Sequence, residues 1–448
     1  MYDFPMVTIM ANPKQKDSIL LLGGELAELL KIESKEIIDF ITGQSTQQVS
    51  ISISQRAKNK KLIYVSPKVL KKLHLRTGRK YGISRQNDGI HIGPVVGVMA
   101  QTYNKTGRPC GGQSLFIREL INAGHRLGQI CFGFSPYSID WNRKLINGYT
   151  YGRNGWVRGV FPLPDVIYPR EQGYTAPIKR IRNKLNQIGC NFINPVLIGK
   201  WNTYKILSQK PELEPYLPET RLIKNFQQVN NMVNRHKAIY MKPINGSKGR
   251  NIIKVVKTSG TYKYQYQINN QIFHGKSQNI TSLRNSLHRV MGNRNYIVQK
   301  QINLLRSQGS VVDVRVMVQK DHTGRWNITG NICRIGKTGS ITSNIAAGGH
   351  ASHLTTVLAH NFDNGETRKA IESEVKMLAL EAAQALEASV GSIGELGIDI
   401  GIDRNGRVWF IEANLKPARQ VFILVRDHQG RRDSVERPLL YSRYLAGF

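Results

Sequence analysis

The sequence predicts a mixed α/β and α+β fold: a small β-rich module, then a Rossmann-like α/β domain, then a larger α+β region. Three observations lead to this fold class. Residues 1 to about 90 contain runs in which apolar and polar residues alternate, as in Gln48–Ser54, which is typical of half-buried strands. From His91 to about residue 195, strands alternate with amphipathic helices, which indicates a parallel sheet. From about residue 200 onward, strands predominate and are joined by glycine-bearing loops.

The individual elements follow from these local patterns. Ser66-Pro67 opens a short Leu/Lys-rich helix, because proline is favoured at the first helical position. The remaining predicted elements, in chain order, are strands 61–65 and 92–99, helix 114–124, strands 129–134 and 166–168, a basic helix at 178–188, helix 200–208, strands 238–242, 252–257, 296–299, 311–318 and 326–334, helix 367–388 and a hairpin at 397–414.

Length and composition indicate a globular protein of several domains. The 448 residues exceed one small core and predict two to four compact units. No run approaches the ~20 apolar residues of a membrane span, and the N-terminus lacks the pattern of a secretory signal. The cysteines have no paired spacing for zinc or for a redox dithiol. We therefore expect a cytoplasmic protein with four free thiols.

The charge of the chain is unusual in size and in distribution. Lys and Arg number 64 against 30 Asp and Glu, which gives a formal charge of +34. No acidic residue occurs between Asp39 and Asp88 or between Glu219 and Asp313. Such a field attracts polyanions. Because no nucleic-acid-binding motif accompanies it, nucleic acid is the weaker alternative. An acidic peptide or cell-wall polymer as partner and a generally basic proteome both remain open.

A predicted hairpin near the C-terminus places two carboxylates side by side. Asn405-Gly406 joins two strand-like runs, and this dipeptide strongly favours a two-residue turn. That turn pairs Asp399 with Glu412 and puts Asn414 on the same face. The other face carries Ile398, Ile400, Ile402, Trp409, Ile411 and Ala413. Opposed carboxylates about 5 Å apart repel each other unless a cation lies between them. The alternatives are a Mg²⁺ site and two solvated carboxylates.

Two further segments carry residues suited to phosphate. The loop after Lys242 contains Gly246, Ser247 and Gly249 and lies between two strands, which excludes a P-loop and favours a flexible flap. Farther on, valines occupy the even positions of 311–318, so Asp313 and Arg315 share the opposite face. An arginine on that face suits a phosphate group, and a surface ion pair is the alternative.

The order of these motifs resembles that of the ATP-grasp superfamily, in the branch of glutathione synthetase and the ribosomal-protein glutamate ligase. The motifs are Gly199–Lys205, Leu217–Thr220, Met241–Pro243 with its flap, Val298–Lys300, Asp313–Arg315, Arg334, Ser343-Asn344 with Gly348-Gly349, Gly397–Asp399 and Glu412–Pro417. The first 200 residues add likeness to the YheC/YheD family of spore-coat-associated proteins, through Ser66–Leu70, His91–Val98 and Pro162–Tyr168.

The resemblance implies a domain plan and a role for each matching residue. The plan is a β-rich module at 1–90, a Rossmann-like pre-ATP-grasp domain at 91–195, a small flap lobe at 196–300 and a large lobe with the metal site at 301–448. The implied roles are nucleotide contact by Lys200, Lys242, Gly246, Ser247, Gly249, Gln299 and Lys300, phosphate or acyl-phosphate binding by Arg315, Arg334 and Asn344, and Mg²⁺ binding by Asp399, Glu412 and Asn414. Two positions depart from the family pattern: Asn251 replaces a flap glycine, and Lys300 replaces a hinge carboxylate.

The sequence leads to two hypotheses about function. The first is an ATP- and Mg²⁺-dependent carboxylate–amine ligase that acts through an acyl phosphate. The second is a non-catalytic, spore-coat-associated or polyanion-binding protein that keeps the fold. The sequence names neither the acid nor the amine. Loops at 100–112, 136–160 and 345–353 are candidates for the acceptor pocket, and Tyr149–Trp156 is expected to be a surface loop or part of that pocket.

Overall fold

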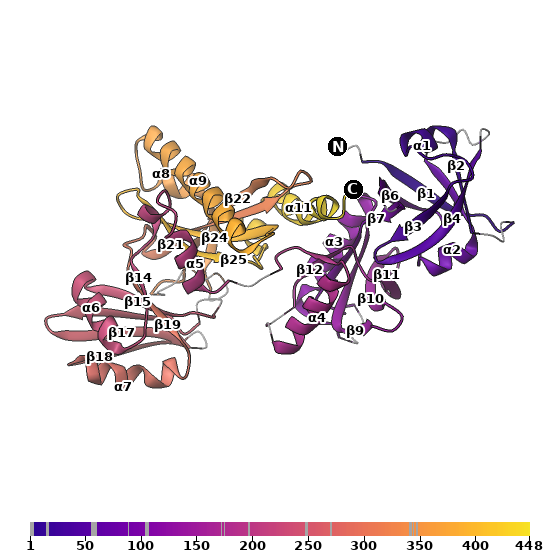
Figure 1. The fold of residues 1–448 in the computed structure, drawn as a ribbon. Helices are drawn as coiled ribbons and strands as arrows, with labels where there is room; N and C mark the ends of the chain where they lie inside the picture. Colours follow the sequence, from indigo (N-terminus) through magenta and orange to yellow (C-terminus); the bar gives the residue numbers. More distant parts are fainter. Residues whose placement is uncertain are drawn as a thin grey trace. The chain divides into compact units, whose positions relative to one another are not determined.

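The structure, a computed structural model, describes residues 4–14, 18–54, 61–87, 89–103, 107–171, 173, 175–195, 198–246, 250–268, 271–339, 343, 345 and 348–448. The chain forms two compact units (Figure 1). The first contains the residues up to Pro195 together with Lys320–Arg325 and Val435–Phe448, and the second contains the rest. Both units combine helices with sheets, so the mixed α/β class is confirmed. The domain boundaries at 90, 195 and 300 stay predictions.

The N-terminal part of the first unit is a closed barrel with the strand order β1-β5-β2-β4-β3-β7-β6. Its elements are β1 (Met6–Ala11), β2 (Ile19–Gly23), α1 (Gly24–Leu29), β3 (Ile37–Thr42), β4 (Ser45–Ser54), β5 (Leu62–Val65), α2 (Pro67–Lys72), β6 (Arg79–Gln86) and β7 (Gly89–Gly93). The predicted alternation is confirmed in β4, where Val49 and Ile51 are buried and the serines beside them are not.

A second sheet of the first unit has the order β11-β10-β9-β8-β12-β13. Its strands and helices are β8 (Val95–Met99), α3 (Ser114–Arg126), β9 (Ile130–Asp140), β10 (Leu145–Gly152), β11 (Gly155–Pro162), β12 (Val166–Pro169), α4 (Ala176–Gln187) and β13 (Asn191–Phe192). β8, β9, β12 and β13 run parallel, as the alternation of strands and helices predicts. The C-terminal helix α11 (His428–Leu445) adds Val435 and Leu439 to the apolar core beside this sheet.

The prediction of a loop at 136–160 was wrong. Strand β9 runs on to Asp140, and β10 and β11 form an antiparallel hairpin in which Gly152 pairs with Gly155. Tyr149–Trp156 therefore forms strand ends and a tight turn. The local alternation of aromatic and small residues was too short to distinguish a strand from a polar loop before the pairing was known.

The second unit contains two sheets. The smaller has the order β14-β19-β15-β16-β17-β18 and carries two helices. Its elements are β14 (Thr220–Leu222), α6 (Phe226–His236), β15 (Ala238–Pro243), β16 (Ile253–Thr258), β17 (Thr261–Ile268), β18 (Gln271–Ser277), α7 (Ile280–Met291) and β19 (Tyr296–Lys300). Asn225 and Asn279 cap α6 and α7 through reciprocal side-chain and backbone contacts.

The larger sheet has the order β23-β22-β21-β24-β25, and the long helix α9 packs on it (Figure 1). The elements are α5 (Lys200–Leu207), β20 (Arg306–Ser307), β21 (Ser310–Lys320), β22 (Trp326–Ile335), β23 (His350–His353), α8 (Leu354–Ala359), α9 (Gly365–Val390), β24 (Glu395–Ile402), β25 (Val408–Asn414) and α10 (Gln420–Leu424). Alternate residues of β21 and β24 face α9, among them the four even-numbered valines.

The turn of the C-terminal hairpin differs from the prediction. The Asp403 N–H donates to the carbonyl of Arg407, and the Gly406 N–H donates to the carbonyl of Asp403. Gly406 has a φ of 85°, in the left-handed region. The loop therefore holds three residues rather than two, a common alternative in which a glycine at the third position closes the turn.

The longer loop shifts the pairs next to the turn, and a bulge corrects them farther along. Ile402 pairs with Val408 and Ile400 with Phe410, one residue away from the predicted register. An irregularity between Asp399 and Ile400 then adds one residue on β25. Asp399 consequently does pair with Glu412, as predicted. Trp409 and Ile411, in contrast, do not share the face of the buried isoleucines; Val408 and Phe410 do.

Each cysteine is buried and free, which agrees with the expected free thiols. None of the helices in the described part of the chain is long and apolar enough to cross a membrane.

Candidate functional site

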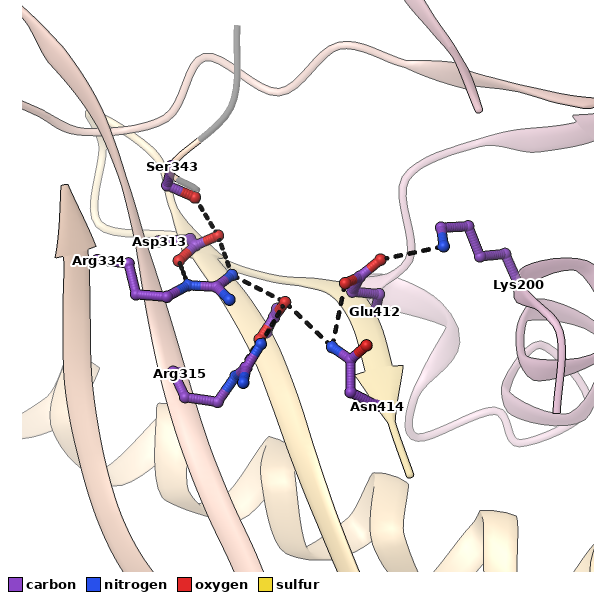
Figure 2. A network of polar contacts seen from close by, with 8 residues as sticks. Lys200, Asp313, Arg315, Arg334, Ser343, Glu412 and Asn414 are labelled. Atoms are coloured by element: carbon purple, nitrogen blue, oxygen red, sulfur yellow. Dashed lines mark hydrogen bonds and ion pairs between the residues drawn. The ribbon is translucent and has the colours of Figure 1, made fainter. Parts of the chain in front are cut away.

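A row of charged side chains crosses three neighbouring strands of the larger sheet. Arg315 of β21 pairs with Asp399 of β24, and Asp399 pairs with Glu412 of β25. The row forms because the valines of β21 take the face toward α9 and leave the odd positions on the opposite face. Backbone pairing thus brings three side chains of the candidate site together; Figure 2 shows Arg315 and Glu412 at the two ends of the row.

Asp399 lies at the centre of this row and is 2% exposed. Arg315 donates to both of its carboxylate oxygens, from Nε at 2.5 Å and from Nη2 at 3.1 Å. Arg334 of β22 adds a third contact of 2.8 Å. Burial alone would raise the pKa of this carboxyl, but the two guanidinium groups outweigh burial and hold the pKa at about 2. Asp399 is therefore ionised at every ordinary pH.

A second buried aspartate shares Arg334. The Nε and Nη2 atoms of Arg334 lie 2.7 and 2.6 Å from the two oxygens of Asp313, and the hydroxyl of Ser343 also donates to Asp313 (Figure 2). Burial raises the pKa of Asp313 despite these donors. The two carboxylates raise the pKa of Arg334 well above its ordinary value, against the effect of burial. Asp313 and Arg315 do not form a surface pair with each other; each binds the opposite charge of a neighbouring strand.

Glu412 lies at the more open end of the row. Its Oε2 is 3.3 Å from Nζ of Lys200, the first residue of α5, and its Oε1 accepts from the amide of Asn414 at 3.0 Å. The same amide nitrogen lies 3.3 Å from Asp399. Lys200 also donates to the carbonyl of Gly246 in the flap, at 2.8 Å. Lys200 thus connects the hairpin to the flap.

Lys242 is held on the smaller sheet by a chain of hydrogen bonds. Its Nζ donates to Oε1 of Gln299 at 2.6 Å, Nε2 of Gln299 donates to the Thr220 hydroxyl at 2.9 Å, and that hydroxyl donates to the carbonyl of Pro218. Burial lowers the pKa of Lys242 to about 8, although the nearby Glu412 raises it. The ammonium is charged at neutral pH and is easily titrated.

The oxygen-bearing side chains at this point of the sheet fit part of a Mg²⁺ coordination shell. Oxygen atoms of Asp399 and Glu412 approach one point, where the Asn414 amide now contacts both. Two carboxylates and an amide oxygen suit a hard cation that completes its shell with substrate phosphates and water. Within the described residues no cluster of three or more His, Cys, Asp and Glu could hold a metal unaided.

The remaining predicted positions divide into two groups. Ser247, Gly249 and Asn344 lie outside the described residues. Lys300 is described, and its Nζ lies 5.8 Å from the centroid of the Trp409 ring. At the flap, Asn251 has a φ of 57°. This is the left-handed conformation that makes asparagine an acceptable replacement for glycine.

Three contacts were missed from the sequence. Ser343 was noted only as the residue before a loop, and Thr220 only as part of a motif, although each anchors a site residue. The third is a buried group at the other end of β24, where Arg419 lies 2.5 Å from Glu395 and Gln319 donates to the same carboxylate at 3.0 Å. A buried Glu in an apolar strand was the available indication, since such a carboxylate requires a partner.

The sequence also matches a known protein family. A family profile described as "YheC/D like ATP-grasp" matches residues 189–445. The chain belongs to the YheC/D-like ATP-grasp family. The matched segment covers more than half of the chain and contains every site residue described above.

The YheC/D-like relatives are similar over most of their length. The endospore coat-associated protein YheD of Bacillus subtilis (strain 168) is 27% identical over 416 residues, which are 90% of this chain and 89% of YheD. The endospore coat-associated protein YheC of the same strain is 25% identical over 337 residues, 74% of this chain and 92% of YheC. Among solved structures, D-cycloserine synthetase DcsG aligns with a TM-score of 0.47 and 11% identity, covering 77% of this chain and 99% of that one.

Proposed function

We propose that this YheC/D-like ATP-grasp protein is an ATP- and Mg²⁺-dependent carboxylate–amine ligase that acts through an acyl phosphate. The observation that carries the proposal is the row formed by Arg315, Asp399 and Glu412, with Arg334 beside it. A fixed group of cations next to two carboxylates on one sheet face suits a triphosphate with its metal ion. On the smaller sheet, Lys242 supplies a further cation.

The reaction proceeds in two balanced steps. A carboxylate oxygen of the acid substrate attacks the γ-phosphorus of ATP, and the bond from that phosphorus to the bridging oxygen of ADP breaks. The amine nitrogen then attacks the acyl carbon, loses one proton and displaces inorganic phosphate, which leaves an amide. Because phosphoryl transfer relies mainly on positioning and charge neutralisation, cationic side chains fixed by the fold are the main contribution of the protein.

Each side chain has a distinct task in this proposal. Arg315 and Arg334 are held rigidly by Asp399 and Asp313, so their remaining N–H groups are oriented toward the transferring phosphoryl group or the acyl phosphate. Mg²⁺, when bound, offsets phosphate charge, and Asp399, Glu412 and Asn414 would hold it. The smaller sheet with α6 and α7 would be the flap lobe, and the larger sheet the metal-binding lobe.

The proposal is tested with Glu412→Gln, which removes one charge and keeps the shape of the side chain. We expect loss of MgATP binding in calorimetry and loss of ADP release in a screen of amino acids and acidic peptides as acid and amine. Glu366→Gln is the matched control, because Glu366 is an exposed residue of α9 whose ion pair with the exposed Lys369 lies away from the candidate site. Unchanged ADP release in a folded Glu412→Gln protein would contradict the proposal.

A second candidate is a non-catalytic protein of the spore coat that binds polyanions. The charge of +34 favours it, and so does the naming of both relatives as endospore coat-associated. The same calorimetry separates the two functions. A folded wild-type protein without measurable MgATP affinity, but with salt-dependent binding of an anionic polymer, supports the second candidate.

A further inference from the structure

The smaller sheet of the second unit has one covered face and one open face. Helices α6 and α7 pack against alternate residues of its strands, among them Met241, Val255 and Tyr262. Residues at the intervening positions face the other way. Lys242 and Gln299 of the candidate site belong to this open face, because Met241 and Val298, the residues before them, are buried beneath the helices.

Basic side chains gather on the open face away from the candidate site. Lys263 of β17 pairs directly with Lys276 of β18, and both are exposed. In the adjacent row, Gln265 pairs with Lys254 on one side and with the exposed His274 on the other. We call this group the basic face; it consists of Lys254, Lys263, His274 and Lys276 together with Arg306 of β20.

Arg306 belongs to this group because it lies near Lys254. Burial lowers the pKa of Lys254, and the positive charge of Arg306 lowers it further. The same guanidinium acts on Tyr240, which lies on the open face of β15. Like charges that face each other across strands are destabilising, so this crowding of cations has a cost that an anionic ligand would remove.

The strands and helices of the smaller sheet contain no carboxylate side chain. The segment 220–312 contains sixteen Lys and Arg residues and no Asp or Glu. The basic face lies on the same side of the sheet as the site lysine, because Lys254 pairs with Tyr240, two residues before Lys242 on β15.

We propose that the basic face binds an acidic peptide, whose reacting end is presented to Arg315 and Arg334. The inference rests on the proposed ligase function for the identity of that site, and it names the class of co-substrate. A peptide is favoured over single-stranded nucleic acid because lysine point charges predominate on the basic face, whereas bases are held mainly by stacking on aromatic rings. The aromatic residues of these strands, Tyr264, Tyr266 and Phe273, stack on one another on the helix side of the sheet.

The test measures the binding of a fluorescent oligo-glutamate by anisotropy, with and without MgATP. The double substitution Lys263→Glu with Lys276→Glu should weaken binding on the order of tenfold at low salt and leave MgATP affinity unchanged. The matched control is Arg284→Glu with Arg289→Glu on α7. It changes the charge of the same lobe by the same amount, at exposed positions on the covered side, and should change binding by less than about twofold.

The outcomes separate the inference from the proposed function. Equal losses in the two double variants, or no oligo-glutamate binding by a protein that binds MgATP, overturn the acidic-peptide proposal and leave the ligase standing. Oligothymidylate of equal charge that binds more tightly than oligo-glutamate through Lys263 and Lys276 also overturns it, in favour of nucleic acid. Binding of oligo-glutamate through the basic face by a protein that fails to bind MgATP supports the peptide site and contradicts the ligase.

Discussion

Lys242 and Asp399 show how burial acts in opposite ways on two side chains of one site. Asp399 is surrounded by guanidinium groups, which keep its charge despite burial. Lys242 is buried with a neutral partner, the Gln299 amide, so burial lowers its pKa to about 8. The charge of Asp399 therefore does not change near neutral pH, whereas the charge of Lys242 does. A bound triphosphate would favour the charged form of Lys242.

The titration of Lys242 predicts proton uptake when MgATP binds. Near pH 9 the ammonium is mostly neutral in the free protein, and a triphosphate beside it favours the charged form. We expect uptake approaching about one proton per nucleotide at that pH and little uptake near pH 6.5, where the lysine is already charged. Calorimetry in buffers of different ionisation enthalpy measures this number.

Lys242→Arg provides the control, because a guanidinium stays charged throughout this range. That variant should bind MgATP with no excess uptake at pH 9. The affinity of the wild type for MgATP should fall as the pH rises through 8, because Lys242 loses its charge. The affinity of the arginine variant should not fall over this range. Equal uptake in the wild type and the arginine variant would show that another group takes up the proton.

At the scale of elements, the C-terminal hairpin positions the metal candidates through a turn and a bulge that offset each other. The three-residue loop moves the register by one residue and the bulge moves it back, so Asp399 meets Glu412. The loop depends on Gly406, whose φ is 85°. A Cβ at this position would also lie 3.1 Å from the Ile371 side chain.

Gly406→Ala should therefore destabilise the second unit by about 1–3 kcal/mol, through the strained conformation at that residue. Urea denaturation followed by circular dichroism measures the change. Gly24→Ala is the control, because Gly24 lies in α1 at an ordinary φ with no atom near the added Cβ. That change should be neutral or slightly stabilising. A Gly406→Ala protein as stable as the wild type would mean that the turn adapts without cost.

The C-terminal hairpin and its neighbouring strands show which features of the site could be predicted from the sequence. Alternation of side chains predicted which residues of β21 face the core, because burial imposes that period locally. The pairing of Asp399 with Glu412 was predicted correctly, although the turn type was wrong and the compensating bulge was not expected. The contact of Arg334 with Asp313 was not predicted, because it depends on how β22 aligns with β21. A tight turn joins these strands, in which the Asp321 N–H donates to the carbonyl of Arg325 and Gly324 has a φ of 74°. This turn was not identified from the sequence, so the register of the two strands was not available from it.

At the scale of the whole molecule, the charge of +34 is a cost to folding as well as a property of the surface. Like charges repel in the compact state, and a chain with 64 basic and 30 acidic residues cannot pair most of its cations. The repulsion is greatest where acidic residues are missing. In the described part of the chain, the smaller sheet of the second unit presents such a surface, with Lys263 directly opposite Lys276.

Stability should accordingly rise with ionic strength. Between about 0.01 M and about 0.15 M salt, the Debye length falls from about 30 Å to about 8 Å, so repulsion between separate surface cations is largely screened. We expect the Tm measured by calorimetry to increase over this range. The increase should be smaller in the double variant Lys263→Gln with Lys276→Gln than in Arg284→Gln with Arg289→Gln. Both variants carry the same net charge, but only the first removes cations that face each other across paired strands.

Equal salt dependence in the two variants would mean that net charge alone, and not the crowding on the basic face, sets the cost. A Tm that falls as salt is added would contradict the repulsion itself.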